Sequence, residues 1–155
     1  QEVAPEQLLA RAAQTYRDRF DPTGPLAPEG ATPHFIAAVN VIATDDADTA
    51  RDLLRRAQVQ WLKAFFGRQQ SISDEQAEAL LPHPQAQHVL AMLDRTVAGT
   101  QSDVVAGLED LIAEVQADEL ILVNLAPDEE HQRRTLQLLA PEPSEHLASP
   151  LSVSP

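Results

Sequence analysis

Hydrophobic and polar positions follow two different periods along the chain, and the change of period divides it into strands and helices. Residues 35–43 are almost continuously apolar and partly β-branched, which is typical of a strand buried on both faces. Shorter runs at 96–100 and 119–125 predict two further strands. Asn40 and Asn124 each place an amide inside one of these apolar runs, and such a residue needs an explanation.

Apolar residues at helical spacing surround and separate the three expected strands. Thr44 or Asp45 is expected to cap the helix after the first strand, and Gly67 is expected to end it. The helix after the second strand is expected to be capped by Thr100 and to bury an apolar face. That face comprises Val104, Val105, Leu108, Leu111, Ile112 and Val115. The first, third and fourth expected helices span residues 5–20, 102–115 and 127–140, and the second runs from its cap to about Phe66.

The remaining segments are rich in proline, glycine and polar residues. Residues 21–33 contain four Pro and two Gly, which predicts a connecting loop. Residues 68–95 form a polar insert with short helices, in which Ser73 and Gln76 make a capping box. Residues 141–155 are rich in Pro and Ser and are expected to be a disordered tail after a folded domain at 1–140. Three strand–helix units with buried strands predict an α/β fold with a parallel sheet.

Composition restricts the kinds of partner. The 155 residues carry a formal net charge of −13, which opposes binding to nucleic acid and to anionic membranes. The absence of Cys excludes disulfides, thiolate catalysis and cysteine-ligated zinc. No apolar run reaches the length of a transmembrane helix, and no signal sequence opens the chain, so we expect a cytoplasmic protein. Because the chain starts at Gln1, we expect a fragment or a processed product.

Most polar clusters in the sequence are better explained by structure than by chemistry. Asp45, Asp46 and Asp48 lack the spacing of a calcium loop and suit a helix start. His83 and His88 are five positions apart and do not share a helix face, so no metal site is expected. The pair Arg133 and Arg134 follows Glu129 and Glu130 by one turn, which favours surface ion pairs over a phosphate site. No catalytic residue is identified.

Asn40 and Asn124 are the remaining candidates for a binding site. A buried amide without a partner costs on the order of 1–3 kcal/mol, so each needs either an internal hydrogen bond or a ligand. Asn124 lies near the carboxyl end of its strand, where α/β folds build their sites. Composition alone favours an internal hydrogen bond for each, and both alternatives stay open at this point.

Five segments together resemble one known family. They are YRDRF, PHFIAAVNVIATDDADTA, TVAGT with its helix, ADELILVN, and the helix ending in LQLLA. In order and spacing they resemble the bacterial luciferase-like flavin-dependent monooxygenases, in particular the luciferase family oxidoreductases, over about residues 5–140. The resemblance implies a partial (β/α)8 TIM barrel. In it 35–43, 96–100 and 119–125 are strands six, seven and eight, and 68–95 is the family's insert. The Gly/Ser-rich flavin-phosphate loop and the first five strands have no counterpart here.

The same resemblance implies a function for the complete enzyme. It would use reduced FMN, or the deazaflavin F420, with O2 to oxidise a small organic substrate, and Asn40 and Asn124 would be cofactor-binding residues. In the related alkanesulfonate monooxygenases, polar functional side chains occupy the positions that correspond to Ala38 and Asn40, so Ala38 has lost such a role here. We expect the chain alone to be inactive and to bind FMN weakly or not at all.

The barrel interpretation makes further structural predictions. The three strands should pair in parallel in the order 35–43, 96–100, 119–125, with right-handed crossovers and helices on one face only. The other face, lined by Ala38, Ile42 and alternate residues of 119–125, should expose apolar side chains and favour self-association or pairing with a missing N-terminal half. Two alternatives are a non-enzymatic half-barrel that pairs with another chain and an unrelated α/β domain that binds a small ligand.

Overall fold

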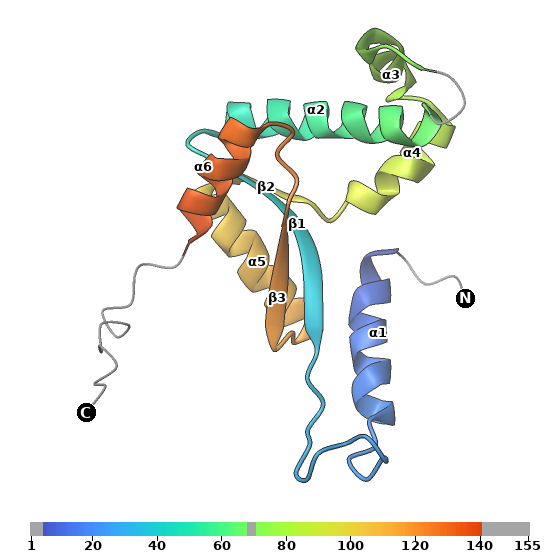
Figure 1. The fold of residues 1–155 in the computed structure, drawn as a ribbon, viewed down its shortest axis with the longest axis vertical. Helices are drawn as coiled ribbons and strands as arrows, with labels where there is room; N and C mark the ends of the chain where they lie inside the picture. Colours follow the sequence, from blue (N-terminus) through green and yellow to red (C-terminus); the bar gives the residue numbers. More distant parts are fainter. Residues whose placement is uncertain (1–4, 68–70, 141–155) are drawn as a thin grey trace, which may run out of the picture.

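The computed structural model describes residues 5–67 and 71–140, so the tail expected at 141–155 lies outside the described residues. Three strands alternate with helices, as the sequence predicts (Figure 1). The elements are α1 (Pro5–Arg19), β1 (Ile36–Thr44), α2 (Ala47–Phe66), α3 (Asp74–Leu80), α4 (Pro84–Leu90), a short 3-10 helix η1 (Ala91–Leu93), β2 (Val97–Thr100), α5 (Gln101–Val115), β3 (Glu119–Asn124) and α6 (Glu129–Leu139).

Local capping signals set most of the helix ends. Thr100 caps α5 and Ser73 caps α3, as predicted. The predicted capping box is the one at Ser73, and the structure has a second one at Thr100, with Asp103 as its partner. The predicted cap of α2 is wrong: Asp46, and neither Thr44 nor Asp45, accepts the Thr49 N–H at 2.8 Å. In the same way α6 starts after Asp128 and not at Pro127. In both helices an aspartate reaches the amide three residues ahead, and this fixes the first turn.

The three strands form one parallel sheet in the order β2-β1-β3. Parallel pairing is confirmed, but the expected order is wrong, because β1 lies in the middle and β3 pairs with it along Ile36 to Val41. Consecutive strands of a (β/α)8 barrel are neighbours, whereas here the chain passes from β2 back across β1 before it enters β3. The α/β class with a parallel sheet stands.

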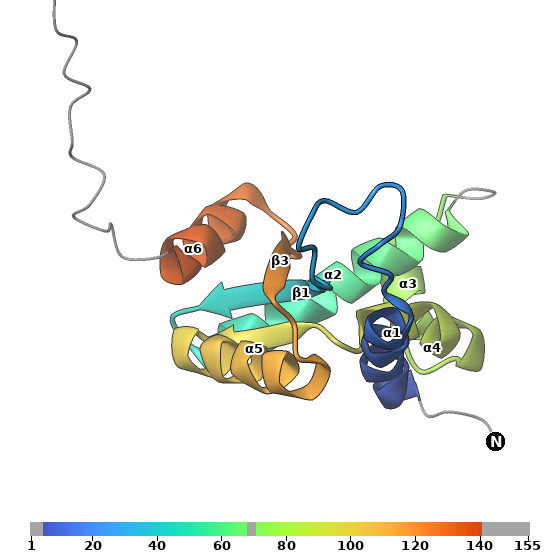
Figure 2. The same ribbon diagram turned by 90° about the horizontal axis from the view of Figure 1, so that it is seen from below.

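The reversal of direction after β2 puts helices on both faces of the sheet. Right-handed crossovers that run in opposite directions along a sheet place their helices on opposite faces. Accordingly α5 packs against β1 and β2 beneath one face (Figure 2), and α2 packs against the same two strands across their carboxyl ends (Figure 1). Val41, Ile42, Ala43 and Thr44 are therefore all buried. The expectation of helices on one face only is wrong for this half of β1.

The main core lies between the sheet and α5. The side chains of β1 that point to this face are Ala37, Val39, Val41 and Ala43, and they pack with Val104, Leu111 and Val115 of α5. Two residues predicted in that core, Val105 and Ile112, are exposed. Gly107 is turned toward Val97 of β2, so Val105 and Ile112 lie on the opposite flank of the helix.

Two further helical groups complete the structure. α1 lies beside the amino-terminal half of β1, which β2 is too short to reach, and buries Ala13 against the main core (Figure 1). The insert forms a second cluster on α2, in which Val59 and Leu62 pack with residues of α3, α4 and η1. No helix in the ranges 5–67 and 71–140 combines the length and apolar character needed to cross a bilayer.

Candidate functional site

One face of the sheet is closed at its carboxyl end and open at its amino end. Ile36, Ala38, Asn40 and Ile42 of β1 all point to this face, because alternate residues of a strand share a side. Ile42 is fully buried, whereas Ile36 is 45% exposed. The β3 residues on the same face, Ile121 and Val123, are 53% and 44% exposed. The expected exposed apolar face is thus confirmed for the amino-terminal half of the sheet, but it is wrong for Ile42, which is fully buried.

A hollow of about 480 Å³ lies over this open half. Its walls come from α1, β1, η1 and β3 and are mostly apolar, which is typical of small-molecule sites. Its lining includes Leu8, Ala12, Ala38, Asn40, Met92 and Val123. The sequence alone singled out Asn40, but it gave no signal for Met92, which the fold of the insert brings to the hollow.

Asn40 provides the neutral polar group of this lining. Its side chain is half-buried, and within the part of the chain that the structure describes its amide makes no hydrogen bond to another residue. An asparagine amide offers one acceptor and two donor hydrogens. A single amide on an otherwise apolar wall is the arrangement that orients a small ligand in an apolar pocket.

Arg95 is the one ionisable residue among the described residues that line the hollow. Its guanidinium holds Glu114 of α5 through two bonds, at 2.9 and 3.3 Å. No carboxylate, histidine or tyrosine lines the described hollow, so the lining offers no side chain suited to general acid–base catalysis.

Asn124, the other predicted site residue, makes hydrogen bonds within the chain. Its Nδ2 donates to the Gln132 carbonyl at 2.8 Å, and its Oδ1 accepts from the Ala126 N–H at 3.2 Å. These bonds join the end of β3 to α6. Asn124 pairs with Val41 and Asn40 pairs with Val123, so the two asparagines point to opposite faces of the sheet. The structure therefore does not bring them into one site.

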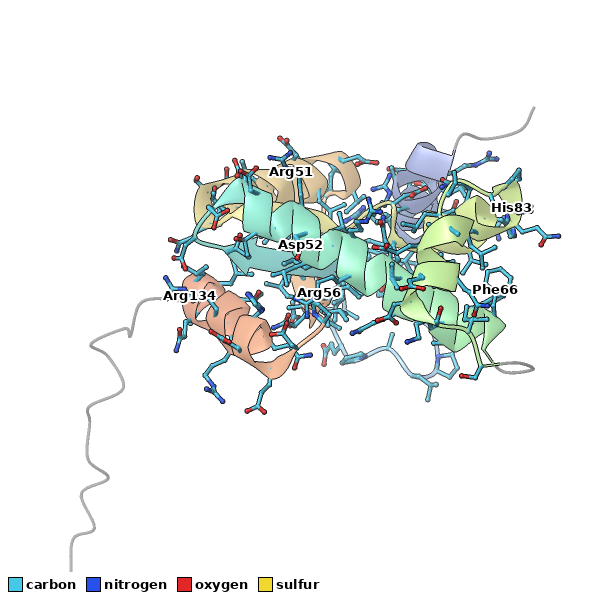
Figure 3. The ribbon with its side chains drawn as sticks, turned by 90° about the horizontal axis from the view of Figure 1, so that it is seen from above. Arg51, Asp52, Arg56, Phe66, His83 and Arg134 are labelled. Carbon is cyan, nitrogen blue, oxygen red and sulfur yellow. The ribbon has the colours of Figure 1, made fainter. Side chains whose placement is uncertain are left out.

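A second, charged hollow of about 390 Å³ lies between α6 and the start of α2. Arg134 of α6 reaches across it and binds Asp45 through both carboxylate oxygens, and Figure 3 shows Arg134 beside the amino-terminal end of α2. Hydrogen bonding from Arg134 lowers the pKa of Asp45, and the carboxylate in turn raises the pKa of Arg134. Arg133 makes the predicted ion pair with Glu129. These charges pair with one another, and the Arg134–Asp45 pair joins α6 to the turn before α2.

The titratable side chains of the described residues do not assemble a metal centre. No group of three or more His, Asp or Glu in residues 5–67 and 71–140 is placed to hold an ion. His83 caps α4 by accepting the Gln85 N–H at 3.3 Å, and His131 lies against Asp128 at 2.6 Å. Hydrogen bonding from His131 lowers the pKa of Asp128, first through the backbone N–H and then through the side chain.

Comparison with known proteins finds a likeness to solved structures. No family model and no curated protein matches the chain. The solved structure of apo-MsnO8 resembles it with a TM-score of 0.64 at 23% sequence identity. The alignment covers 86% of this chain and 40% of MsnO8, so the chain spans less than half the length of that neighbour. The likeness supports a mixed α/β fold that also occurs within a longer protein.

Proposed function

We propose that the chain is part of a luciferase-like flavin-dependent oxidoreductase, and that the hollow beside Asn40 receives the flavin ring. The observation that carries the proposal is the Asn40 amide, which has no partner among the described residues and stands on an apolar wall. The serial resemblance of five sequence segments to the luciferase-like family supports the same conclusion.

The lining residues fit the ring system of a flavin. One edge of that ring carries carbonyl oxygens and an N–H, which are complementary to the donor and acceptor of an amide such as Asn40. The rest of the ring is flat and apolar and suits walls of the kind that Ala38, Met92 and Val123 provide. FMN and the deazaflavin F420 share the amide-like edge, so the proposal covers both cofactors.

Each part of the hollow has a defined role in this proposal. Asn40 would hold the edge of the ring, and the apolar residues would keep water from the reacting face. A bound reduced flavin would supply the reaction with O2 that oxidises a small organic substrate. The described residues include no glycine-rich loop for the cofactor phosphate, and Arg95 is already bonded to Glu114. The phosphate therefore needs residues beyond those described.

The (β/α)8 barrel belongs to the proposal as well. In a complete barrel β1, β2 and β3 would be strands six, seven and eight, so β3 would pair with β2 and not with β1. The outer edge of β2 is free of a strand partner in the described sheet. Addition of the first five strands would thus require β3 to change neighbours, and a structure of the longer protein would test this.

A flavin titration tests the proposal on the chain itself. We expect FMN fluorescence to change weakly but measurably as the protein is added at up to about 1 mM, an affinity of about −4 kcal/mol. Riboflavin should bind equally well, because the described hollow holds the ring and not the phosphate. Asn40→Leu should remove the signal, whereas Gln60→Leu, which also replaces an amide by leucine but at an exposed position of α2, should leave it unchanged. Identical titrations of wild type and Asn40→Leu would refute the proposed role of Asn40.

A non-enzymatic small-ligand-binding domain is the second candidate. The absence of an acid–base side chain from the described lining favours it. Such a hollow would take flat apolar molecules with or without an amide-like edge. An anilinonaphthalene dye separates the two candidates. The flavin proposal predicts that Asn40→Leu weakens flavin binding and spares dye binding, and a general apolar site predicts that the exchange changes neither.

A further inference from the structure

β3 is the least covered strand of the described sheet. It lies at the edge of the sheet, with β1 on one side and no strand on the other. Ile121 and Val123 are exposed on one face, and Leu122 is 41% exposed on the opposite face. Natural edge strands are usually short, charged, bulged or covered. β3 is six residues long and exposes apolar side chains on both faces.

The backbone of β3 also presents unused hydrogen-bonding groups. Val41 pairs with Asn124, and its carbonyl accepts the Leu125 N–H at 3.0 Å. In a parallel pair the N–H and C=O of one residue point to the same side, and the side alternates along the strand. The residues of β3 whose polar groups turn away from β1 are therefore Leu120, Leu122 and Asn124.

The charge distribution makes this edge suitable for contact between like molecules. The chain has a net charge of −13, but residues 120–127 contain no charged side chain. At the start of the strand, Oε2 of Glu119 lies 3.4 Å from Nε2 of His34 in the same chain. Two copies that meet along residues 120–125 bring no charged side chain of that segment into the contact.

We propose that β3 pairs with β3 of a second copy of this chain, antiparallel and centred on Leu122. A two-fold axis perpendicular to the sheet relates the two strands and closes the assembly as a dimer. The outward groups of Leu122 then bond to those of Leu122 in the second copy, and Leu120 bonds to Asn124. Ile121 lies opposite Val123 on the open face. No charge faces a like charge in this register.

The dimer leaves the Asn40 amide in place and so does not depend on flavin binding, but it concerns this chain alone, because in the proposed complete barrel β3 would have a strand neighbour on each side. Two strongly acidic chains repel each other, and salt screens that repulsion over about 10 Å at 0.1 M. Dimerisation through an uncharged edge should consequently become tighter as salt is added.

Sedimentation equilibrium of the full chain tests the proposal. We expect a reversible monomer–dimer equilibrium that tightens with salt. Leu122→Lys places two like charges opposite each other at the two-fold axis and should weaken the dimer by roughly tenfold or more. Leu136→Lys introduces the same charge at an exposed leucine of α6, outside β3, and should leave the dimer intact. A chain that stays monomeric at all concentrations, or a dimer unaffected by Leu122→Lys, would overturn the proposal.

Hydrogen exchange gives a readout that needs no variant. In the dimer the amides of Leu120, Leu122 and Asn124 should gain protection as the protein concentration rises. The amides of Ile121 and Val123 already point to β1 and should change less. Concentration-dependent protection elsewhere, with none at the outward amides, would show that the copies meet at another surface.

Discussion

Ile42 and Ile36 belong to the same strand and point to the same face of the sheet, yet one is fully buried and the other is 45% exposed. The difference comes from their neighbours, because α2 and β2 reach the carboxyl half of β1 and do not reach its amino half. The closed half has polar groups that are bonded within the chain, whereas the open half carries the Asn40 amide. Hydrophobicity of a strand therefore does not tell which part of it the protein buries.

In the closed half, backbone groups at the end of β1 are hydrogen-bonded by a side chain, where no neighbouring strand reaches them. β3 pairs with β1 only as far as Val41. Beyond it the hydroxyl of Thr135 on α6 accepts the Ala43 N–H at 3.1 Å and donates to the Ala43 carbonyl at 3.0 Å. One buried side chain thus satisfies two backbone groups that a neighbouring strand would otherwise bond.

The largest expected difference is between alanine substitutions at the two isoleucines. Ile42→Ala should cost about 2–5 kcal/mol of unfolding free energy, because it leaves a cavity in a closed region. Ile36→Ala should cost less than about 1 kcal/mol, because the side chain is already half exposed. Urea unfolding of both variants measures the comparison. Equal losses would mean that the open half is covered in solution.

Thr135→Val should have the next largest effect. The methyl group that replaces the hydroxyl leaves the Ala43 N–H and C=O without partners in a buried place, at a cost of about 1–3 kcal/mol. Thr135→Ser keeps the hydroxyl and should lose less than about 1 kcal/mol. If the two variants unfold at the same urea concentration, the hydroxyl is not what holds α6 to β1.

The two asparagines should respond differently to the same exchange. Asn124→Leu breaks bonds to Gln132 and Ala126 and should destabilise the chain by about 1–2 kcal/mol. Asn40→Leu removes an amide without a described partner and should change stability by no more than about 0.5 kcal/mol in either direction. Thermal and urea unfolding of both variants test this contrast. A large loss for Asn40→Leu would reveal an internal hydrogen-bond role.

The smallest expected effect is a dependence on pH that comes from the closed end. The Thr49 N–H lowers the pKa of Asp46, and the His131 N–H lowers that of Asp128. A carboxylate whose pKa is lower in the folded state stabilises the fold above its unfolded value, about 3.9, and loses that contribution as pH falls through the folded value. The urea concentration at the midpoint of unfolding should therefore decrease when the pH is lowered below about 4. The decrease should be smaller for the Asp46→Asn variant, because position 46 then carries no carboxyl group that can be protonated.

The sequence predicts the elements that local signals control. The cap at Thr100, the capping box at Ser73 and the apolar run of β1 are predicted from residues close together in the chain, and the structure has all three. The sheet order was not predictable in this way. Two right-handed crossovers are compatible with β3 on either side of the β1–β2 pair, and no local pattern distinguishes the two arrangements.

The candidate site can be predicted only in part, because local sequence patterns do not report contacts between distant residues. Asn40 stands out as an amide in an apolar run, but Asn124 gives an identical signal and is bonded by Gln132 of a later helix. Arg95 and Met92 enter the lining of the hollow from the end of the insert. Distant contacts of this kind decide which of two similar residues is available to a ligand.

The most direct test of this account is to follow the side-chain amide signals of the two asparagines by NMR while a flavin is added. Asn40 and Asn124 are the only asparagines in the chain, and Leu substitution of each assigns its signal. If the flavin ring binds at Asn40, the Asn40 signals shift progressively with riboflavin and with FMN, while the Asn124 signals stay fixed. Unchanged Asn40 signals at saturating flavin, or shifts confined to Asn124, would contradict it.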